Sequence, residues 1–246
     1  MTARPVALVT GASRGIGRGI AIELSRTHAV VGTYQARHDM AQLLAAEFGV
    51  DAVQCDVASG TDRRALLDHV ASHYGGVDLL VNNAGMAPRE RRDILEGEES
   101  SFDELIAANL KGPHFLTQQC ARGMMARGSG RIVFITSISA YAVSVNRAEY
   151  CISKAGLSMS AALYAHRLAP HNVQVFEIRP GIIRTDMIAP VEQRYEELIR
   201  AGLIPQRRMG EAEDVARVVR AISDGLLDYS SGTVIDVDGG FRLRSL

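Results

Sequence analysis

The sequence lacks the features that mark secreted, metal-bound or membrane proteins. Cys55, Cys120 and Cys151 are its only cysteines, and with no CxxC pair or metal-spaced cluster they favour reduced thiols in a reducing compartment. His69 and His73 stand four apart on an expected helix, but a third ligand and an HExxH glutamate are missing, so we expect no metal site. No stretch approaches the roughly 20 uninterrupted apolar residues of a membrane span, and we expect no membrane partner.

An excess of charge of one sign is also lacking. The chain has 27 Lys and Arg against 28 Asp and Glu, and its formal net charge of -1 gives no sign of a nucleic-acid partner. The apolar run Val6–Val9 starts so close to Met1 that it leaves no room for a signal peptide. We therefore expect a cytoplasmic protein.

Short β-branched runs alternate with longer segments of helical period along the whole chain. The runs are apolar throughout, without in-out alternation, which is typical of a parallel sheet covered on both faces. This alternation predicts an α/β fold with a doubly wound parallel sheet and helices on both faces. The expected strands are residues 6–9, 29–34, 52–55, 79–81, 131–135, 173–178 and 233–237, and the expected helices are residues 15–26, 63–74, 102–126, 150–168 and 214–223.

No repeat, low-complexity tract or linker interrupts this alternation, so we expect a single domain over residues 1–246. Two stretches look irregular, residues 86–101 and 185–210. Each follows the end of an expected strand, where doubly wound sheets place their ligand crevice. We expect these two stretches to be substrate loops.

Tyr150 and Lys154 are the most informative pair in the chain. Their four-residue spacing places both side chains on one face of a helix. A free tyrosine titrates at about 10, and bringing it to roughly 7 needs about 4 kcal/mol of preferential phenolate stabilisation, which a nearby ammonium can supply. The pair is therefore a candidate for proton transfer. The alternative for these residues alone is an ordinary helix with an exposed lysine and a half-buried tyrosine.

A glycine-rich turn, Thr10–Gly17, falls directly between the first expected strand and the first helix. Glycines at this place let the backbone approach a pyrophosphate, and the helix N-terminus offers free N–H groups to it. The spacing Gly-x-x-x-Gly-x-Gly differs from the GxGxxG fingerprint, and a tight strand-to-helix connection is the alternative.

Further motifs follow the glycine turn along the chain. In order, the sequence contains Thr10–Gly17, Asn82–Gly85, Asn109, Ser137, Tyr150, Lys154 and Pro180-Gly181, with twelve residues between Ser137 and Tyr150. Together these motifs resemble the short-chain dehydrogenase/reductase family, most closely its bacterial 3-oxoacyl-[acyl-carrier-protein] reductases, over essentially the whole chain. The resemblance implies a Rossmann-type fold, a nicotinamide cofactor and hydride exchange between a carbonyl and a secondary alcohol. It also implies a cofactor half at about residues 1–130 and a catalytic and substrate half at about residues 131–246.

The resemblance also implies a role for each catalytic residue. Tyr150 is the general acid in reduction, and Ser137 donates a hydrogen bond to the carbonyl oxygen. Ser139 is the rival for that second role. Lys154 favours the phenolate and binds the nicotinamide ribose, and Asn109 holds a water that relays protons to Lys154. A helix-kinking or capping amide is the alternative for Asn109.

The implied cofactor site extends well beyond the glycine turn. Asp56 is expected at the adenine amine, with a helix N-cap as its alternative. The residues after the fourth and sixth strands are expected beside the nicotinamide, although an Asn-Asn-x-Gly stretch is also a common turn. The full expected set is Gly11, Ser13, Arg14, Gly15, Ile16, Gly17, Arg37, Asp56, Val57, Asn83, Ala84, Gly85, Tyr150, Lys154, Pro180, Gly181, Ile183 and Thr185.

The end of the second strand bears on the choice of cofactor. An acid there would accept the ribose hydroxyls of NAD, but the sequence reads Tyr34-Gln35-Ala36-Arg37. Arg14 and Arg37 suit a 2′-phosphate, since guanidinium matches phosphate geometry. We therefore predict NADP(H) as the preferred cofactor, with NAD(H) possible. Two solvated surface arginines are the alternative.

The substrate is less well defined by the sequence. Gly128 and His171 stand where acyl-carrier reductases commonly have basic residues, although Arg127 could compensate, and Arg179 is unusual beside the cofactor. This leaves a sugar or polyol dehydrogenase as an alternative, and a non-catalytic dinucleotide-binding regulatory protein as an alternative of another class. The run Arg89–Arg92 could attract an anionic substrate or simply be solvated. By resemblance we expect a small-molecule substrate and a homo-tetramer or dimer.

Overall fold

The seven expected strands form one parallel sheet in the computed structural model, which describes residues 4–243. The strand order is β3-β2-β1-β4-β5-β6-β7, and each neighbouring pair is parallel. The order reverses between β1 and β4, the topological switch point of a doubly wound sheet, so the predicted fold class is confirmed. The strands are β1 (Val6–Val9), β2 (Ala29–Tyr34), β3 (Asp51–Gln54), β4 (Leu79–Asn82), β5 (Gly130–Ile135), β6 (Val173–Pro180) and β7 (Val234–Val237).

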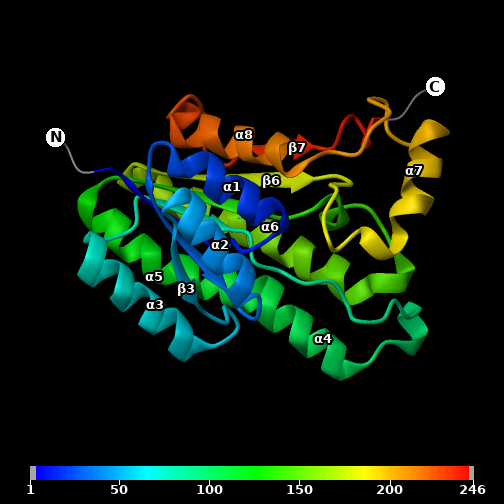
Figure 1. Cartoon of the computed structure of the whole chain (residues 1–246), viewed down its shortest axis with the longest axis horizontal. Coiled ribbons are helices and arrows are strands. Elements are labelled where there is room, and N and C mark those ends of the chain that lie inside the picture. The colour runs from blue at the N-terminus through cyan, green and yellow to red at the C-terminus, as the bar shows by residue number, and fades with distance from the viewer. Residues whose placement is uncertain (1–3, 244–246) are drawn as a thin grey trace.

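Helices cover both faces of this sheet (Figure 1). One apolar core packs α1 (Gly15–Ser25), α2 (His38–Phe48) and α8 (Ala212–Ser223) against the strands. The opposite core contains residues of α3 (Gly60–Tyr74), α5 (Gly112–Arg127) and α6 (Ala148–Leu168). The remaining helices are α4 (Glu99–Ile106) and α7 (Glu192–Arg200), the π-helical turn Ala107–Lys111, and the 3-10 turns Ile94–Glu96, Ile138–Ala140, Val145–Arg147, Ala169–His171, Ala189–Val191 and Asp228–Ser230.

The central strands explain why their sequences carry no in-out alternation. Phe134 of β5 points into the core with α5 and α6, whereas its neighbour Val133 points into the core with α1 and α8. Successive side chains of a strand face opposite sides, so both sides must be apolar here. Burying a large side chain such as Phe134 or Phe176 stabilises the fold by roughly 1.5–3 kcal/mol.

The structure corrects the sequence prediction at three helices. Helix α2 was not predicted, although its Ala- and Leu-rich sequence and the left-handed Gly49 at its end are helix signals. Helix α7 lies in the stretch expected to be irregular. It has one buried residue, Ile199, and its apolar spacing of Tyr195, Leu198 and Ile199 covers a single turn of a charged sequence, which is too short a pattern to identify a helix. The helix expected over residues 102–126 is interrupted by the π-helical turn Ala107–Lys111.

The sheet directs the loops that matter for function. The carboxyl ends of its parallel strands lie at one edge, and α7 stands beyond that edge, apart from the helices that cover the faces (Figure 1). The loops at the carboxyl edge therefore enclose the region where a ligand is expected.

Among residues 4–243, no helix combines the length and the apolar character that crossing a bilayer requires.

Candidate active site

A cavity of about 900 Å³ lies at the carboxyl ends of the strands. Segments that follow β1, β2, β3, β4, β5 and β6 form its wall, so it spans the switch point of the sheet. The wall includes the whole set of residues that the sequence predicts for the cofactor: Gly11, Ser13, Arg14, Gly15, Ile16, Gly17, Arg37, Asp56, Val57, Asn83, Ala84, Gly85, Tyr150, Lys154, Pro180, Gly181, Ile183 and Thr185. Segments far apart in sequence thus converge on one space.

The glycine-rich turn leaves an open cradle at the start of α1. Gly11 and Gly15 have φ values of 68° and 53°, the left-handed region that favours glycine. A Cβ on Gly17 would lie 2.1 Å from the Gly11 carbonyl oxygen and 2.4 Å from Asn83 Nδ2. Arg14, the N-cap residue, makes no capping hydrogen bond with its side chain within the described structure. The exposed N–H groups fit the pyrophosphate of a dinucleotide.

Tyr150 and Lys154 lie side by side on α6 and line the cavity. The two residues are 7% and 4% exposed, so both are buried in the cavity wall. Lys154 Nζ lies 5.8 Å from the Tyr150 ring centroid and donates a hydrogen bond of 3.1 Å to the Ile135 carbonyl. Burial lowers the pKa of Lys154 to about 8, and the negative charge of Glu177 opposes this shift.

The electrostatics of Tyr150 differ from the sequence expectation. Burial raises its pKa, whereas the Ser137 hydroxyl and the positive charge of Arg147 lower it. The Arg147 guanidinium carbon lies 5.4 Å from the centroid of the Tyr150 ring. Arg147 therefore supplies the favourable charge that the sequence prediction gave to Lys154, because the Lys154 ammonium is directed to the Ile135 carbonyl.

Both candidate serines line the cavity, and they differ in what they bind. Ser137 Oγ accepts the Ser139 N–H at 3.0 Å, which leaves its hydroxyl proton available to a ligand. Ser139 Oγ is 4% exposed at residue level and accepts a long 3.4 Å contact from Arg147. The geometry favours Ser137 as the donor to a carbonyl beside Tyr150.

Asn109 lies one layer behind the cavity wall. It is fully buried in the π-helical turn between α4 and α5, and its Nδ2 donates to Met86 O at 2.9 Å and Ser153 Oγ at 3.1 Å. Its Oδ1 accepts the Met86 N–H at 2.8 Å. The helix irregularity that the alternative interpretation expected is present here, and the relay through a held water stays a prediction.

Behind the catalytic helix, Glu177 forms a buried charged centre that the sequence analysis missed. Its Oε1 accepts hydrogen bonds from Thr136 Oγ1 at 2.6 Å and Arg179 Nε at 2.7 Å, and its Oε2 accepts one from Ser158 at 2.8 Å. Arg179 also lies over the Tyr141 ring, with 5.4 Å between guanidinium carbon and centroid. Expected beside the cofactor, Arg179 instead belongs to this network behind the wall, because its charge pairs with Glu177.

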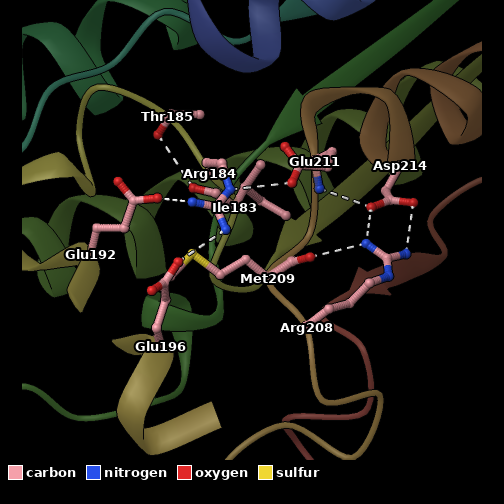
Figure 2. A network of polar contacts seen from close by, with 9 residues as sticks. All are labelled: Ile183, Arg184, Thr185, Glu192, Glu196, Arg208, Met209, Glu211 and Asp214. Atoms are coloured by element: carbon pink, nitrogen blue, oxygen red, sulfur yellow. Dashed lines mark hydrogen bonds and ion pairs between the residues drawn. The ribbon is translucent and has the colours of Figure 1, made fainter. Parts of the chain in front are cut away.

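A lid formed by residues 182–210 closes the far side of the cavity. The segment leaves and rejoins the sheet edge at one parallel bridge between Ile183 and Gly210. Its own residues Ile182, Ile199, Ile204 and Met209 form a small apolar cluster. Arg184 anchors α7 by ion pairs with Glu192 and Glu196, and it also reaches Glu211 at the start of α8 (Figure 2). The bridge, the apolar cluster and the ion pairs of Arg184 together hold the lid.

The cavity wall also contains residues that were not predicted from the sequence. Arg147 precedes the catalytic helix, and Tyr195 and Leu198 belong to the unpredicted helix α7. Phe241 reaches the wall from the segment after β7. No motif marks these positions, since their place depends on how the lid folds back over the sheet.

The basic residues considered for substrate or partner binding are mostly engaged. Within the run 89–92, Arg89 lines the cavity and is bound to Glu104 at 2.7 Å. Arg92 pairs instead with Glu90 and Glu98 on the exposed surface. Arg127 donates to the Val77 carbonyl at 2.5 Å, at the start of β4 and β5, the sheet edge opposite the cavity.

The fold and this cavity define a doubly wound α/β oxidoreductase that uses a dinucleotide. Comparison with known proteins narrows the class. The family model described as Enoyl-(Acyl carrier protein) reductase matches residues 11–242. The 3-oxoacyl-[acyl-carrier-protein] reductase FabG of Aquifex aeolicus is 37% identical over an alignment of 247 positions, which covers 96% of each protein.

Solved structures give the same result. A 3-oxoacyl-[acyl-carrier protein] reductase from Brucella melitensis in complex with NAD is 40% identical, with a TM-score of 0.93 over 100% of both chains. A putative gluconate dehydrogenase from Agrobacterium tumefaciens is 28% identical, with a TM-score of 0.89 over 97% of this chain and 96% of that one. The chain belongs to the short-chain dehydrogenase/reductase family, as predicted, and is an oxidoreductase that interconverts a carbonyl and an alcohol with a nicotinamide cofactor.

Proposed function

We propose that this protein is an NADPH-preferring reductase of 3-oxoacyl compounds, with Ser137, Tyr150 and Lys154 at the reacting centre. One observation carries the proposal. These three side chains converge on the wall of the same cavity that has the open glycine cradle of α1 at its other end. A carbonyl at the wall and a dinucleotide in the cradle therefore share one enclosed space, and relatives named as 3-oxoacyl reductases support the substrate class.

The residues act on the carbonyl oxygen. When bound, the cofactor supplies hydride to the carbonyl carbon in reduction and accepts it in oxidation. Ser137 donates a hydrogen bond that strengthens as negative charge develops on the oxygen, and Tyr150 transfers its proton to that oxygen. Lys154, held beside Tyr150, is placed to bind the nicotinamide ribose and to return a proton to the tyrosine. Asn109 fixes the loop at Met86 behind them.

The substrate test compares acetoacetyl thioesters with a panel of sugars and polyols, using NADPH or NADP⁺ as appropriate. We expect the thioester to be reduced with a kcat/KM well above that of each sugar or polyol. Preferential oxidation of a polyol would move the protein to the sugar or polyol dehydrogenases. A protein that binds the cofactor but turns over no carbonyl or alcohol would instead be a regulatory dinucleotide-binding protein.

The cofactor preference rests on the charges beside β2. Arg14 and Arg37 line the cavity, and no acid stands among Tyr34, Gln35 and Ala36. Arg37 pairs with Asp39 at 3.1 Å, but both side chains are exposed, and such pairs contribute little and yield to a phosphate. The similar reductase from Brucella melitensis was solved in complex with NAD, so the preference of this protein for NADPH over NADH has to be measured.

We expect kcat/KM to be at least about tenfold higher for NADPH than for NADH, because a charge-assisted hydrogen bond to the 2′-phosphate is worth that much. Arg37→Ala should abolish the difference by lowering kcat/KM for NADPH alone. The matched variant Asp39→Asn should retain or raise the preference. A wild-type ratio below one, or a loss of NADH activity in Asp39→Asn, would assign the site to NAD.

We further propose a cytoplasmic homo-tetramer. The exposed apolar side chains Phe102, Phe115, Met159 and Leu163 on α4, α5 and α6 support association of copies. Size-exclusion chromatography with light scattering should give four times the chain mass of 26.6 kDa. A monomer at micromolar concentration would contradict this assembly.

A further inference from the structure

Arg147 differs from the other arginines of the cavity wall. Four arginines line the cavity, and three of them have carboxylate partners: Arg14 with Asp186, Arg37 with Asp39, and Arg89 with Glu104. Among residues 4–243, no carboxylate oxygen lies within 4.0 Å of the Arg147 guanidinium. This cation stands at the reacting centre without a countercharge from the described chain.

The carboxylates nearest in sequence or on the wall are directed elsewhere. Glu149 accepts a hydrogen bond from Ser101 at 2.9 Å, and Asp56 accepts the Ala58 N–H at 2.9 Å. Glu104 and Asp186 are the partners of Arg89 and Arg14. A rearrangement that neutralises Arg147 would therefore have to break a contact already made.

In the part of the chain that the structure describes, the hydrogen bonds that the Arg147 guanidinium makes are long and go only to serine hydroxyls. Its Nε donates to Ser144 Oγ at 3.3 Å and one terminal nitrogen donates to Ser139 Oγ at 3.4 Å, both at the long end of hydrogen-bond geometry. Its guanidinium carbon lies over the Tyr150 ring, 5.4 Å from the ring centroid. Most of its five N–H donors remain available to a ligand.

We propose that Arg147 binds an anionic group of the substrate close to the carbonyl, so that the preferred substrate is a free oxo acid rather than its neutral thioester or ester. The inference rests on the proposed function, since it places the carbonyl at Ser137 and Tyr150. A guanidinium fork matches a carboxylate bidentately, and partial burial beside the Tyr150 ring strengthens the pair. In 3-oxo acids the carboxylate is two bonds from the carbonyl carbon, which suits a cation packed on the same tyrosine.

Arg147 also acts on the chemistry through its charge. It lowers the pKa of Tyr150 against the larger opposing effect of burial. A bound carboxylate neutralises part of that charge and makes the phenol less acidic than in the free enzyme. The free acid and a neutral ester should therefore show different pH profiles of turnover, with the acid reduced up to the higher pH. This follows because reduction requires the protonated tyrosine.

The experiment compares acetoacetate with methyl acetoacetate and with the N-acetylcysteamine thioester of acetoacetate, in the wild type and in Arg147→Gln, Arg147→Lys and Arg122→Gln. Arg122 is an exposed arginine of α5 outside the cavity wall, so its variant controls for net charge. In the wild type, acetoacetate should have the highest kcat/KM. Arg147→Gln should lower it by about 10- to 100-fold, mainly through KM, which is the loss of one charge-assisted pair.

The same variant also removes a positive charge beside Tyr150, an effect that all three compounds share. The kcat/KM for the ester and the thioester should therefore fall at least about tenfold less than that for the acid, because only the acid also loses a charged hydrogen bond. Arg147→Lys should recover part of the acid activity, and Arg122→Gln should resemble the wild type. A wild type that prefers the thioester, or an Arg147→Gln variant that loses activity equally on all three compounds, overturns the proposal while leaving the reductase assignment intact. Failure of the wild type on all three compounds would instead overturn the proposed function.

A binding measurement keeps the inference testable without turnover. Malonate is titrated calorimetrically into the Tyr150→Phe protein, which retains the ring and lacks the reacting hydroxyl. We expect binding that Arg147→Gln in the same background weakens at least about tenfold and Arg122→Gln leaves unchanged. Equal affinity in the protein with and without Arg147 would show that the anion site is elsewhere and overturn the proposal.

Discussion

The two ends of the cavity are built by different means. At the cofactor end, backbone groups make the site: glycines without Cβ atoms, the first turn of α1 and the strand ends of the switch point. At the substrate end, side chains make it: the lid held by Arg184, the lone Arg147 and the buried Glu177 network. The first end suits a cofactor shared by many enzymes, whereas the second can change without disturbing the fold.

The largest expected effect comes from Tyr150→Phe, which removes the proton donor where the two ends meet. Reduction should fall by at least about 10²- to 10⁴-fold in kcat, the usual contribution of general acid catalysis. Cofactor affinity, measured by NADPH fluorescence, should change little because the cradle of α1 is untouched. Ser139→Ala is the matched control and should retain most activity. Near-normal turnover by the phenylalanine variant would place the acid elsewhere.

The second-largest effect is expected from Gly17→Ala, which should disrupt the cofactor end of the cavity. The added methyl would meet Gly11 O at 2.1 Å, a backbone atom that cannot swing aside. We expect destabilisation of about 1–3 kcal/mol from overpacking, together with loss of detectable cofactor binding. Gly60→Ala is the control, because the nearest atom to its Cβ would be 3.6 Å away, an ordinary van der Waals contact. Denaturant titration and NADPH fluorescence measure the two effects, and unimpaired binding by Gly17→Ala would contradict the cradle.

Lys154 lies between the two ends, and its burial should appear as a pH-dependent cost to stability. Its pKa falls from 10.5 to about 8 on folding, so the unfolded chain binds more protons between these values. The cost, about 3 kcal/mol, is complete below pH 8 and disappears as the pH rises to about 10.5. Lys154→Met should therefore be inactive yet more stable than the wild type at pH 7, with a smaller advantage at pH 10. Urea denaturation at both pH values tests this, and an advantage that grows with pH would have the wrong sign.

The smallest effect is expected at the lid. Arg184→Met removes the ion pairs to Glu192, Glu196 and Glu211, each of them exposed and worth little alone. Together they should change KM for the substrate about three- to tenfold and leave cofactor KM unchanged, and the wild type should approach the variant at high salt. Arg26→Met, which removes the exposed pair with Glu23, is the control. A change in cofactor KM would show that the ends are not independent.

The residues that line the cofactor end of the cavity could be selected from the sequence because their determinants are local, and their contacts with a cofactor stay a prediction. Glycines in a turn, such as Gly11 and Gly15, indicate a left-handed backbone conformation directly, because other residues rarely adopt it. Apolar runs likewise identify strands whose carboxyl ends must meet at one edge.

The substrate end could not be predicted in the same way, because its features depend on pairings across the fold. Whether Arg147 has a countercharge depends on where Glu104 and Glu149 point. Whether Arg179 enters the cavity depends on Glu177, two residues away on the same strand. Helix α7 was missed because its apolar residues Tyr195, Leu198 and Ile199 span a single turn of an otherwise charged sequence.

The lid has one further consequence for how the protein can be altered. It begins and ends at a bridge between Ile183 and Gly210, where Arg184 N and Gly210 N donate to the carbonyls of Gly210 and Ile182, both at 2.9 Å. A segment whose two ends are held side by side is a cassette. It can be exchanged for the corresponding segment of another enzyme of this fold, with β6 and α8 as fixed splice points. Changes confined to this segment should therefore alter the range of alcohols that the enzyme forms and leave the residues of the hydride transfer unchanged.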